Sequence, residues 1–599
     1  MRSAMTSTSL HHPRRLGDYS ADYRMLILAA MATVAGTGGA FSAWALLKLI
    51  AFATNVFWYG SFSFDKAVIA HRAPLLVLLI PVAGGLIVGL MARFGSDKIR
   101  GHGIPEAIET ILYGESKLSM KVALLKPLSS AVSIGSGGPF GAEGPIIMTG
   151  GAIGSLFAQL FRLSAAERKT LLVAGATAGM TGIFGTPFAS IMLAVELLLF
   201  EWKPRSFVPV ATAVLVSLAW RPLLVGSGPL FPFAAATPAG IEPVAISAGI
   251  GLVTGLEAAL LSFILYRLED GFHRLPIHWM WWPAIGAIVV GIGGLFDLRV
   301  LGAGYGVIQQ LVDGHLLVKA VLLLLVVKAV VWLVALASGT SGGILAPLLI
   351  LGGCAGFLMG QYLPGDPGFW AMIGMAGVMS GVMRAPMTGA LFAAELTNHL
   401  SALPETIAAG SAAYAVSVLI MKRSILTEKI ARRGRHILRE YTVDPLEFLL
   451  AGQVMTPKPT TLAGSMTLSQ TVSFFREEAQ HRSYPVVDGR GRLLGLVSRT
   501  DALRWKQEGP LRLEAHLADV LSDASTLVAY PETPCGEVAD MMVESGTGRV
   551  PIVDPQSREV VGILSRQDLL KVRSTQKLGE TVRPAERPEK PRPATEVPG

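Results

Sequence analysis

A single carboxylate, Glu143, lies in a long apolar stretch of glycines, prolines and small side chains, GSGGPFGAEGPIIMTGG at 135–151. A charged side chain inside a bilayer is costly, so its presence indicates function. Small residues before a helix leave the first N–H groups unpaired, and the dipole adds about half a positive charge there. Such a helix start binds a small anion without lysine or arginine. We predict that Glu143 gates an anion site by occupying it when ionised and leaving it when protonated. The alternative is a glutamate placed in a first helical turn only to complement the dipole.

Two further segments have the same character, GHGIPEAIE at 101–109 and TSGGILAPLL at 340–349. Each presents flexible backbone followed by residues that form helices. Three helix starts punctuated by glycine and proline predict an anion pathway built mainly from backbone amides.

The elements that position these segments must lie in a membrane. Of the 599 residues, 51% are hydrophobic and only 16% are charged, against about 25% charged in soluble domains. Residues 329–365 contain no Asp, Glu, Lys or Arg, and this run exceeds the roughly 20 residues of a spanning helix. The composition excludes a disordered chain, a collagen and a single-anchor enzyme.

The net charge of +8 is concentrated at the margins of the apolar zone. Arg14 and Arg15 precede the first apolar run, and a basic cluster at 422–435 follows the last. Positive residues flank cytoplasmic ends of spanning helices, so we expect both termini in the cytoplasm and the protein in the plasma (inner) membrane. The same distribution argues against a nucleic-acid partner and predicts contact with membrane lipid.

The apolar zone contains an internal repeat. TPFASIMLAVEL at 186–197 resembles APMTGALFAAEL at 385–396 with an offset of 199 residues, and Ser136-Gly137-Gly138 matches Ser341-Gly342-Gly343. Matched interrupted segments in two halves are typical of transporters whose site lies at the membrane midplane. The alternative is that these glycines and prolines only allow close helix packing.

The C-terminal zone predicts a soluble α/β structure with a second repeat. YPVVDGRGRLLGLVSRTDAL at 484–503 resembles VPIVDPQSREVVGILSRQDLL at 550–570, and each copy reads as strand, turn, strand and helix. The predicted boundaries are a polar lead over 1–22, a membrane domain over 23–430, a linker over 431–450, repeat units over 451–510 and 511–573, and a disordered tail over 574–599.

These motifs resemble those of the CLC chloride channels and chloride/proton antiporters. GAEGP, GHGIP and GGILAP are similar to the family's GREGP, GSGIP and GxFxP elements and stand in the same order. The C-terminal repeat resembles a pair of CBS domains. The resemblance implies an all-α polytopic membrane domain of about 18 helices in inverted halves, a cytoplasmic α/β CBS pair, and a homodimer with one pore per subunit. It implies a transporter of chloride or a similar anion rather than an enzyme.

By this resemblance, Glu143 matches the gating glutamate. His102 stands where the family has a serine; its imidazole can donate to an anion, or it is a polar residue facing water. Leu426 stands at the position of the tyrosine that contacts the central anion. The anion-binding residues implied by the resemblance are Gly101, His102, Gly103, Ile104, Pro105, Gly141, Ala142, Gly144, Pro145, Gly343, Ile344, Leu345 and Leu426.

Proton coupling is the open question. Antiporters of the family carry a proton-accepting glutamate at the position of Leu197, and an apolar side chain cannot relay a proton. We therefore expect passive, channel-like conduction, with a proton-coupled antiporter as the alternative. In that alternative, Glu196 or Glu201 serves the proton path.

Each soluble repeat ends in a strand followed by Ser-x-x-Asp. In CBS domains, this Asp binds the ribose of an adenine nucleotide, and a carboxylate accepts two hydrogen bonds at once. An Ser/Asp pair at a helix start also serves as a cap. Transport itself requires no cofactor; the alternatives for the CBS pair are that it binds an adenine nucleotide or that it binds nothing and only dimerises, and the residues concerned are Ser498, Asp501, Ser565 and Asp568.

Two other classes of membrane protein are disfavoured because their characteristic motifs do not occur in the sequence. An intramembrane metalloprotease with CBS domains requires a motif such as HExxH, and none of the eleven histidines is followed by glutamate. A divalent-cation transporter favours rings of acidic residues in its pore, whereas glycines and one glutamate form this one. No metal site is predicted.

Overall fold

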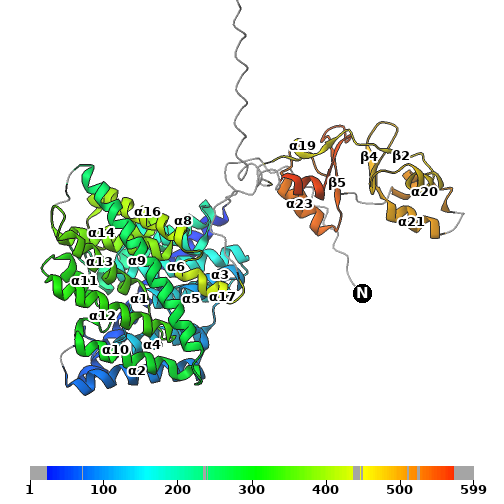
Figure 1. The fold of residues 1–599 in the computed structure, drawn as a ribbon. Coiled ribbons are helices and arrows are strands. Elements are labelled where there is room, and N and C mark those ends of the chain that lie inside the picture. The colour runs from blue at the N-terminus through cyan, green and yellow to red at the C-terminus, as the bar shows by residue number, and fades with distance from the viewer. Residues whose placement is uncertain are drawn as a thin grey trace, which may run out of the picture. The chain divides into compact units, whose positions relative to one another are not determined.

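The computed structural model describes residues 23–69, 72–233, 238, 240–435, 446, 449–508, 512–521 and 527–572 (Figure 1). The chain divides into two compact units, one within 18–439 and one that comprises 440–599 with 1–17. The predicted lead at 1–22 and tail at 574–599 lie outside the described residues. Each unit is considered by itself.

The unit within 18–439 is helical and contains seventeen α-helices among its described residues. Proline stands in the first turn of several of them, including α3, α7 and α15, where its missing N–H leaves no bond unmade. The first eight helices are α1 (Arg24–Tyr59), α2 (Pro74–Phe94), α3 (Ile104–Tyr113), α4 (Met120–Gly135), α5 (Glu143–Gln159), α6 (Ala165–Phe184), α7 (Pro187–Leu193), which continues as a π-helical turn η2 (Ala194–Leu199), and α8 (Pro204–Leu224).

The second series has the same order of long and short helices. It comprises α9 (Glu242–His273), α10 (Trp282–Phe296), α11 (Tyr305–Val312), α12 (Val318–Ala337), α13 (Leu345–Gly360), α14 (Pro367–Met383), α15 (Pro386–Leu396) and α16 (Leu403–Ile420), and α17 (Ile425–Arg432) follows it. Short 3₁₀ turns are η1 (Asp97–Ile99), η3 (Trp279–Trp281), η4 (Leu298–Val300) and η5 (Leu400–Ala402).

The two series pack in the same way. In the first, α5 packs on α6 and α1 on α8; in the second, α13 packs on α14 and α9 on α16. Within the described residues, seven helical stretches are long and apolar enough to cross a membrane. Helix α14 is shorter and is buried from Gly368 to Met383, so the long helices shield short central ones. The predicted two-fold repeat of the membrane domain is therefore confirmed.

The structure corrects one register of that repeat. Ser136 ends α4 and its hydroxyl donates to the carbonyl of Ser133, three residues back. Ser338, not Ser341, ends α12 and donates in the same way to the carbonyl of Ala335. The offset here is 202 residues, against 199 further along, because the loops between the elements differ in length. Local sequence likeness alone could not fix the alignment.

The described part of the C-terminal unit contains two three-stranded sheets in the orders β1-β6-β5 and β2-β3-β4 (Figure 1). The strands are β1 (Thr456–Pro457), β2 (Leu462–Ala463), β3 (Ser483–Val487), β4 (Leu493–Ser498), β5 (Arg549–Val553) and β6 (Val560–Ser565). The helices are α19 (Ala451–Val454), α20 (Leu468–Glu477), α21 (Arg499–Gln507), α22 (Leu517–Leu521) and α23 (Cys535–Glu544).

The two soluble repeats share their irregular details. Antiparallel pairing of β3 with β4 shifts register after Val486, and pairing of β5 with β6 shifts after Ile552. Asp488 and Asp554 stand in equivalent turns of the two repeats. In each turn backbone N–H groups donate to the carboxylate and hold its pKa below the usual range. Strand β1 belongs to the first repeat but pairs with β6 of the second. The predicted α/β repeat is confirmed, and this strand ties its two copies into one unit.

Candidate anion-binding site

The three helix starts predicted to form an anion pathway meet in the structure. The N–H of Gly141 donates to the carbonyl of Gly343 at 3.1 Å, and the N–H of Gly343 donates back at 2.8 Å. The segment before α3 joins them, because the N–H of Gly101 donates to the carbonyl of Gly339 at 3.3 Å. Segments that lie about 200 residues apart in sequence therefore form one site.

Close backbone approach explains the glycines at this junction. A Cβ built on Gly144 would lie 1.9 Å from the carbonyl oxygen of His102, closer than any real contact. A Cβ on Gly141 would lie 2.0 Å from Oε2 of Glu143. Only glycine at these two positions lets α3 approach α5 and leaves room for the carboxylate.

Glu143 is the first residue of α5 and its side chain is fully buried, with 0% exposure. Neither carboxylate oxygen has a hydrogen-bond partner among the described residues. The backbone N–H groups of Glu143 and Ala346, in the first turns of α5 and α13, act on it as weak donors that fall short of regular hydrogen-bond geometry. A carboxylate held by the field of two helix starts, without fixed hydrogen bonds, can be displaced by another anion.

The structure brings most of the other predicted residues into the same region. Gly103 precedes α3 with a φ of +87°, and a Cβ there would lie 3.2 Å from the carbonyl oxygen of Gly144. All members of the three segments are buried: Gly101, His102, Gly103, Ile104, Pro105, Gly141, Ala142, Gly144, Pro145, Gly343, Ile344 and Leu345.

His102 does not face water, because its side chain is only 4% exposed. Its Nδ1 has no hydrogen-bond partner in the described part of the chain. The charges that act on the ring are those of Lys429, Glu106, Lys126 and Arg433, three of them positive. The ring therefore combines an unpaired nitrogen with a cationic environment, a combination that suits an anion.

Leu426 provides no polar atom to the site. It is fully buried in α17 and belongs to the apolar core of the helical unit. Helix α17 nevertheless contacts α3: Nζ of Lys429 lies 2.9 Å from Oε1 of Glu106, and a Cβ on Gly101 would lie 2.6 Å from that Nζ. The predicted segment is thus adjacent to the site, but its contribution there is cationic.

The two glutamates predicted for a proton path lie in different settings. Glu196 accepts from the N–H groups of Met387 and Thr388 at 3.2 and 2.8 Å, which caps the start of α15. Glu201 accepts from the hydroxyl of Ser206 at 2.6 Å, and its side chain is 20% exposed. No contact among the described residues joins either carboxylate to Glu143.

A buried lysine that is not among the predicted site residues also holds the site together. Lys126 in α4 is 0% exposed, and its Nζ donates to the carbonyls of Ile99 and Gly101 at 2.8 and 2.7 Å and to the Ser341 hydroxyl at 3.1 Å. It thereby connects the segment before α3 with the segment before α13.

A matching lysine stands 202 residues later. Lys328 in α12 donates to the carbonyls of Val300 and Gly302 at 2.8 and 3.3 Å, before α11. The signal was present in the sequence: each lysine stands in the interior of an apolar helix, and Gly101-His102-Gly103 recurs as Gly302-Ala303-Gly304. This pattern identifies α11 as a fourth interrupted helix start.

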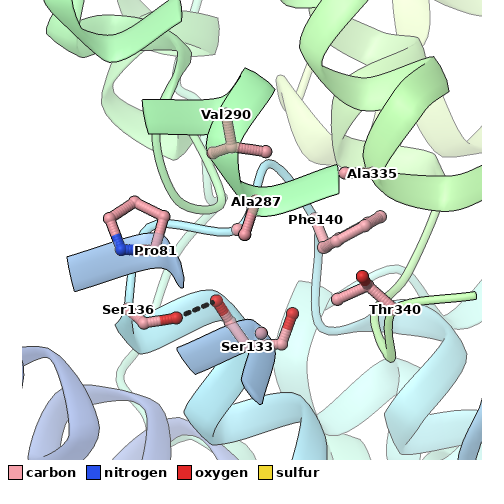
Figure 2. Close-up of a pocket in the computed structure, with 10 residues that line it drawn as sticks. Pro81, Ser133, Ser136, Phe140, Ala287, Val290, Ala335 and Thr340 are labelled. Carbon is pink, nitrogen blue, oxygen red and sulfur yellow. Dashed lines mark hydrogen bonds between the residues drawn. The ribbon is translucent and has the colours of Figure 1, made fainter. Parts of the chain in front are cut away.

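A small pocket lies behind the loops that carry the site (Figure 2). Figure 2 shows Thr340 next to Phe140, which precedes Gly141, and Ser133 and Ser136 on the other side of the pocket. The pocket has no charged lining residue. It is therefore distinct in chemistry from the position of Glu143.

Comparison with known proteins agrees with this geometry. A model of the voltage gated chloride channel family matches residues 84–418, and a model of the CBS domain matches 451–508 and 518–575. The chain is 27% identical over 398 residues to the H(+)/Cl(-) exchange transporter ClcA of Klebsiella pneumoniae, across 63% of this chain and 81% of that protein. It is 28% identical over 370 residues to the voltage-gated ClC-type chloride channel ClcB of Salmonella typhimurium, across 60% and 88%.

Two solved structures resemble the structure of this chain. A slow cyanobacterial Cl−/H+ antiporter superposes with a TM-score of 0.59 at 21% identity, over 69% of this chain and 99% of that one. A eukaryotic CLC transporter superposes with a TM-score of 0.58 at 19% identity, over 91% and 98%. At these identities the likeness establishes the fold.

Proposed function

Because the chain belongs to the voltage-gated chloride channel (CLC) family, we propose that it exchanges small inorganic anions, chloride first, for protons. The protein is a multi-pass membrane protein with a CBS region. The observation that carries the proposal is the buried Glu143 carboxylate, unpaired between the helix starts of α5 and α13. When ionised it fills the anion position; when protonated it loses the attraction of the amides and gives way to chloride.

Passive conduction was expected because Leu197 stands at the position of the proton acceptor. It has less support than exchange. The ClcA relatives are named as H(+)/Cl(-) exchangers, and the cyanobacterial structure is titled an antiporter. Leu197 is buried in η2 and cannot carry a proton, so another group must serve. Our candidate is Glu201, which is partly exposed and lies 3.8 Å from Nζ of Lys169 and 4.0 Å from a guanidinium nitrogen of Arg205.

Reconstitution into liposomes with simultaneous recording of anion and pH tests this function. A chloride gradient is expected to drive protons uphill in the parent protein. Glu201→Gln is expected to reduce that proton movement while chloride still passes. Glu196→Gln is expected to keep the coupling and to lower thermal stability, because this carboxylate caps α15. Chloride flux without any uphill proton movement in the parent would establish passive conduction instead.

The assembly and orientation are part of the same proposal. We expect a homodimer with one pore in each subunit, in the plasma (inner) membrane, with both termini in the cytoplasm. The family resemblance supports the dimer, and the basic residues at 422–435 that follow α16 support the orientation.

For the CBS pair we propose an adenine nucleotide as regulator. Both repeats hold their Ser-x-x-Asp motif identically: the hydroxyl of Ser498 donates to Asp501 and that of Ser565 to Asp568, each at 2.6 Å. These contacts are helix caps. Asp568 keeps its second oxygen for a ribose hydroxyl, whereas the second oxygen of Asp501 accepts from the Arg504 guanidinium at 3.0 Å, a contact that a ribose hydroxyl would have to replace.

Calorimetric titration of the full-length protein with ATP, ADP and AMP tests the regulator. Binding by the parent and a loss of about tenfold or more in Asp501→Asn or Asp568→Asn are expected, because a charged acceptor is removed. Absence of heat with all three nucleotides would leave the motif with its capping role alone.

A further inference from the structure

Tyr305 is the first residue of α11, the fourth interrupted helix start. By the 201-residue register of Gly101 and Gly103 with Gly302 and Gly304, it corresponds to Ile104 of the anion pathway. The two halves are inverted in this fold, so α3 and α11 approach α5 from opposite sides of the membrane. His102 lies against Gly144 on one side, and Tyr305 lies against Ala142 on the other.

The contact of Tyr305 with the site is polar. The N–H of Ala142 donates to the Tyr305 hydroxyl oxygen at 3.4 Å, and Ala142 immediately precedes Glu143. The hydroxyl oxygen is therefore an acceptor here, and its own proton has no acceptor in the described part of the chain. The Glu143 carboxylate acts electrostatically on this hydroxyl. A hydroxyl proton without an acceptor among the described residues thus lies within electrostatic reach of the Glu143 carboxylate.

The surroundings of the ring fix its position. Its centroid lies 6.3 Å from that of Phe184 and 6.0 Å from that of Phe231. A phenylalanine would pack equally well between these rings, so apolar packing does not account for the hydroxyl. The residue as a whole is partly exposed, but its hydroxyl end lies against the start of α5.

Resting on the exchange function proposed above, we propose that the Tyr305 hydroxyl is a specificity-determining group of the transport pathway. Its O–H donates a hydrogen bond to the negatively charged group that lies in front of α5. That species is the Glu143 carboxylate when the gate is closed and the transported anion when the gate is open. The hydroxyl contact that the family places at Leu426 is thereby supplied from α11.

Other charged groups around Glu143 lie on a different side. Lys126 of α4, Glu106 of α3 and Lys429 of α17 act on His102, which lies against α5 from the α3 side. On the α11 side, Tyr305 is the titratable group that Glu143 influences. Removing its hydroxyl therefore changes one contact of the gate without altering the cationic neighbours of His102.

Tyr305→Phe in liposomes tests the proposal through the pH dependence of chloride transport. The hydroxyl stabilises the ionised carboxylate, so its loss eases protonation. The pH of half-maximal transport is expected to rise by about one unit, since a hydrogen bond to a charged group is worth about tenfold or more. In a Glu143→Gln background the same substitution is expected to weaken chloride binding about tenfold in calorimetric titration, with no pH shift.

Tyr59→Phe is the matched control, since it loses one hydrogen bond, to the carbonyl of Val68 at 2.5 Å, at the end of α1. It should change neither the pH midpoint nor chloride affinity. If Tyr305→Phe, folded by its thermal transition, also changes neither, the proposal is overturned; equal shifts in both variants overturn it too. A parent that passes chloride without uphill protons refutes exchange alone, and the affinity measurement still decides the role of Tyr305.

Discussion

Glu143→Gln is expected to abolish proton movement in liposomes while chloride continues to pass. Glutamine keeps the size of the side chain but carries neither a charge nor a transferable proton. The neutral amide cannot compete with chloride for the helix starts of α5 and α13, where the carboxylate is buried without a fixed partner. Proton flux should therefore fall to that of protein-free liposomes, and the pH dependence of chloride flux should disappear.

Glu257→Gln is the matched control for this experiment. Glu257 is another glutamate in an apolar helix, α9, and its Oε2 also lacks a partner among the described residues. Among the described residues no hydrogen bond or ion pair joins it to the segments at 101–109, 135–151 and 340–349, so coupling should persist in this variant. Unchanged chloride and proton fluxes in Glu143→Gln would remove Glu143 from the gate and, with it, the proposed exchange mechanism.

Lys126→Met is expected to damage both stability and anion binding. Methionine has a similar length but no donor, so the carbonyls of Ile99 and Gly101 and the hydroxyl of Ser341 lose a buried hydrogen bond. Each unsatisfied group costs about 1–3 kcal/mol of folding free energy, so the midpoint temperature of thermal unfolding should fall clearly. Because the lysine joins the segments before α3 and α13, chloride affinity should fall by about tenfold or more.

Two lysines serve as comparisons for Lys126. Lys121→Met changes an exposed residue one turn earlier in α4 and should alter neither property. Lys328→Met removes the corresponding bonds to Val300 and Gly302 and should lower stability while weakening chloride binding less, because it leaves the link to Ser341 intact. Full chloride affinity in a stable Lys126→Met protein would show that the lysine does not organise the site.

Much of the site could be predicted because each helix start is determined by residues close to it in the sequence. Glycines and a proline around Glu143, Gly101 and Gly343 interrupt the chain and begin a helix within a few residues, and the cost of a carboxylate in lipid marks Glu143. Composition likewise identifies the membrane class, and local likeness identifies both repeats. These are properties of short stretches of chain.

The remaining features depend on contacts between distant segments. The sequence contains Lys126 and Tyr305, but only packing brings them to Ser341 and Ala142. It contains Glu196 as a candidate proton acceptor, whereas the structure places its carboxylate at the start of α15.

The sequence by itself therefore determined which residues begin the pore helices, that they lie in a membrane and that they repeat. The tertiary structure alone decided that these starts converge on Glu143, that Ser338 is the true partner of Ser136, and which side chains surround the gate. The reason is physical: a helix start is set by its own glycines and prolines, whereas a binding site is set by the packing of helices far apart in the chain.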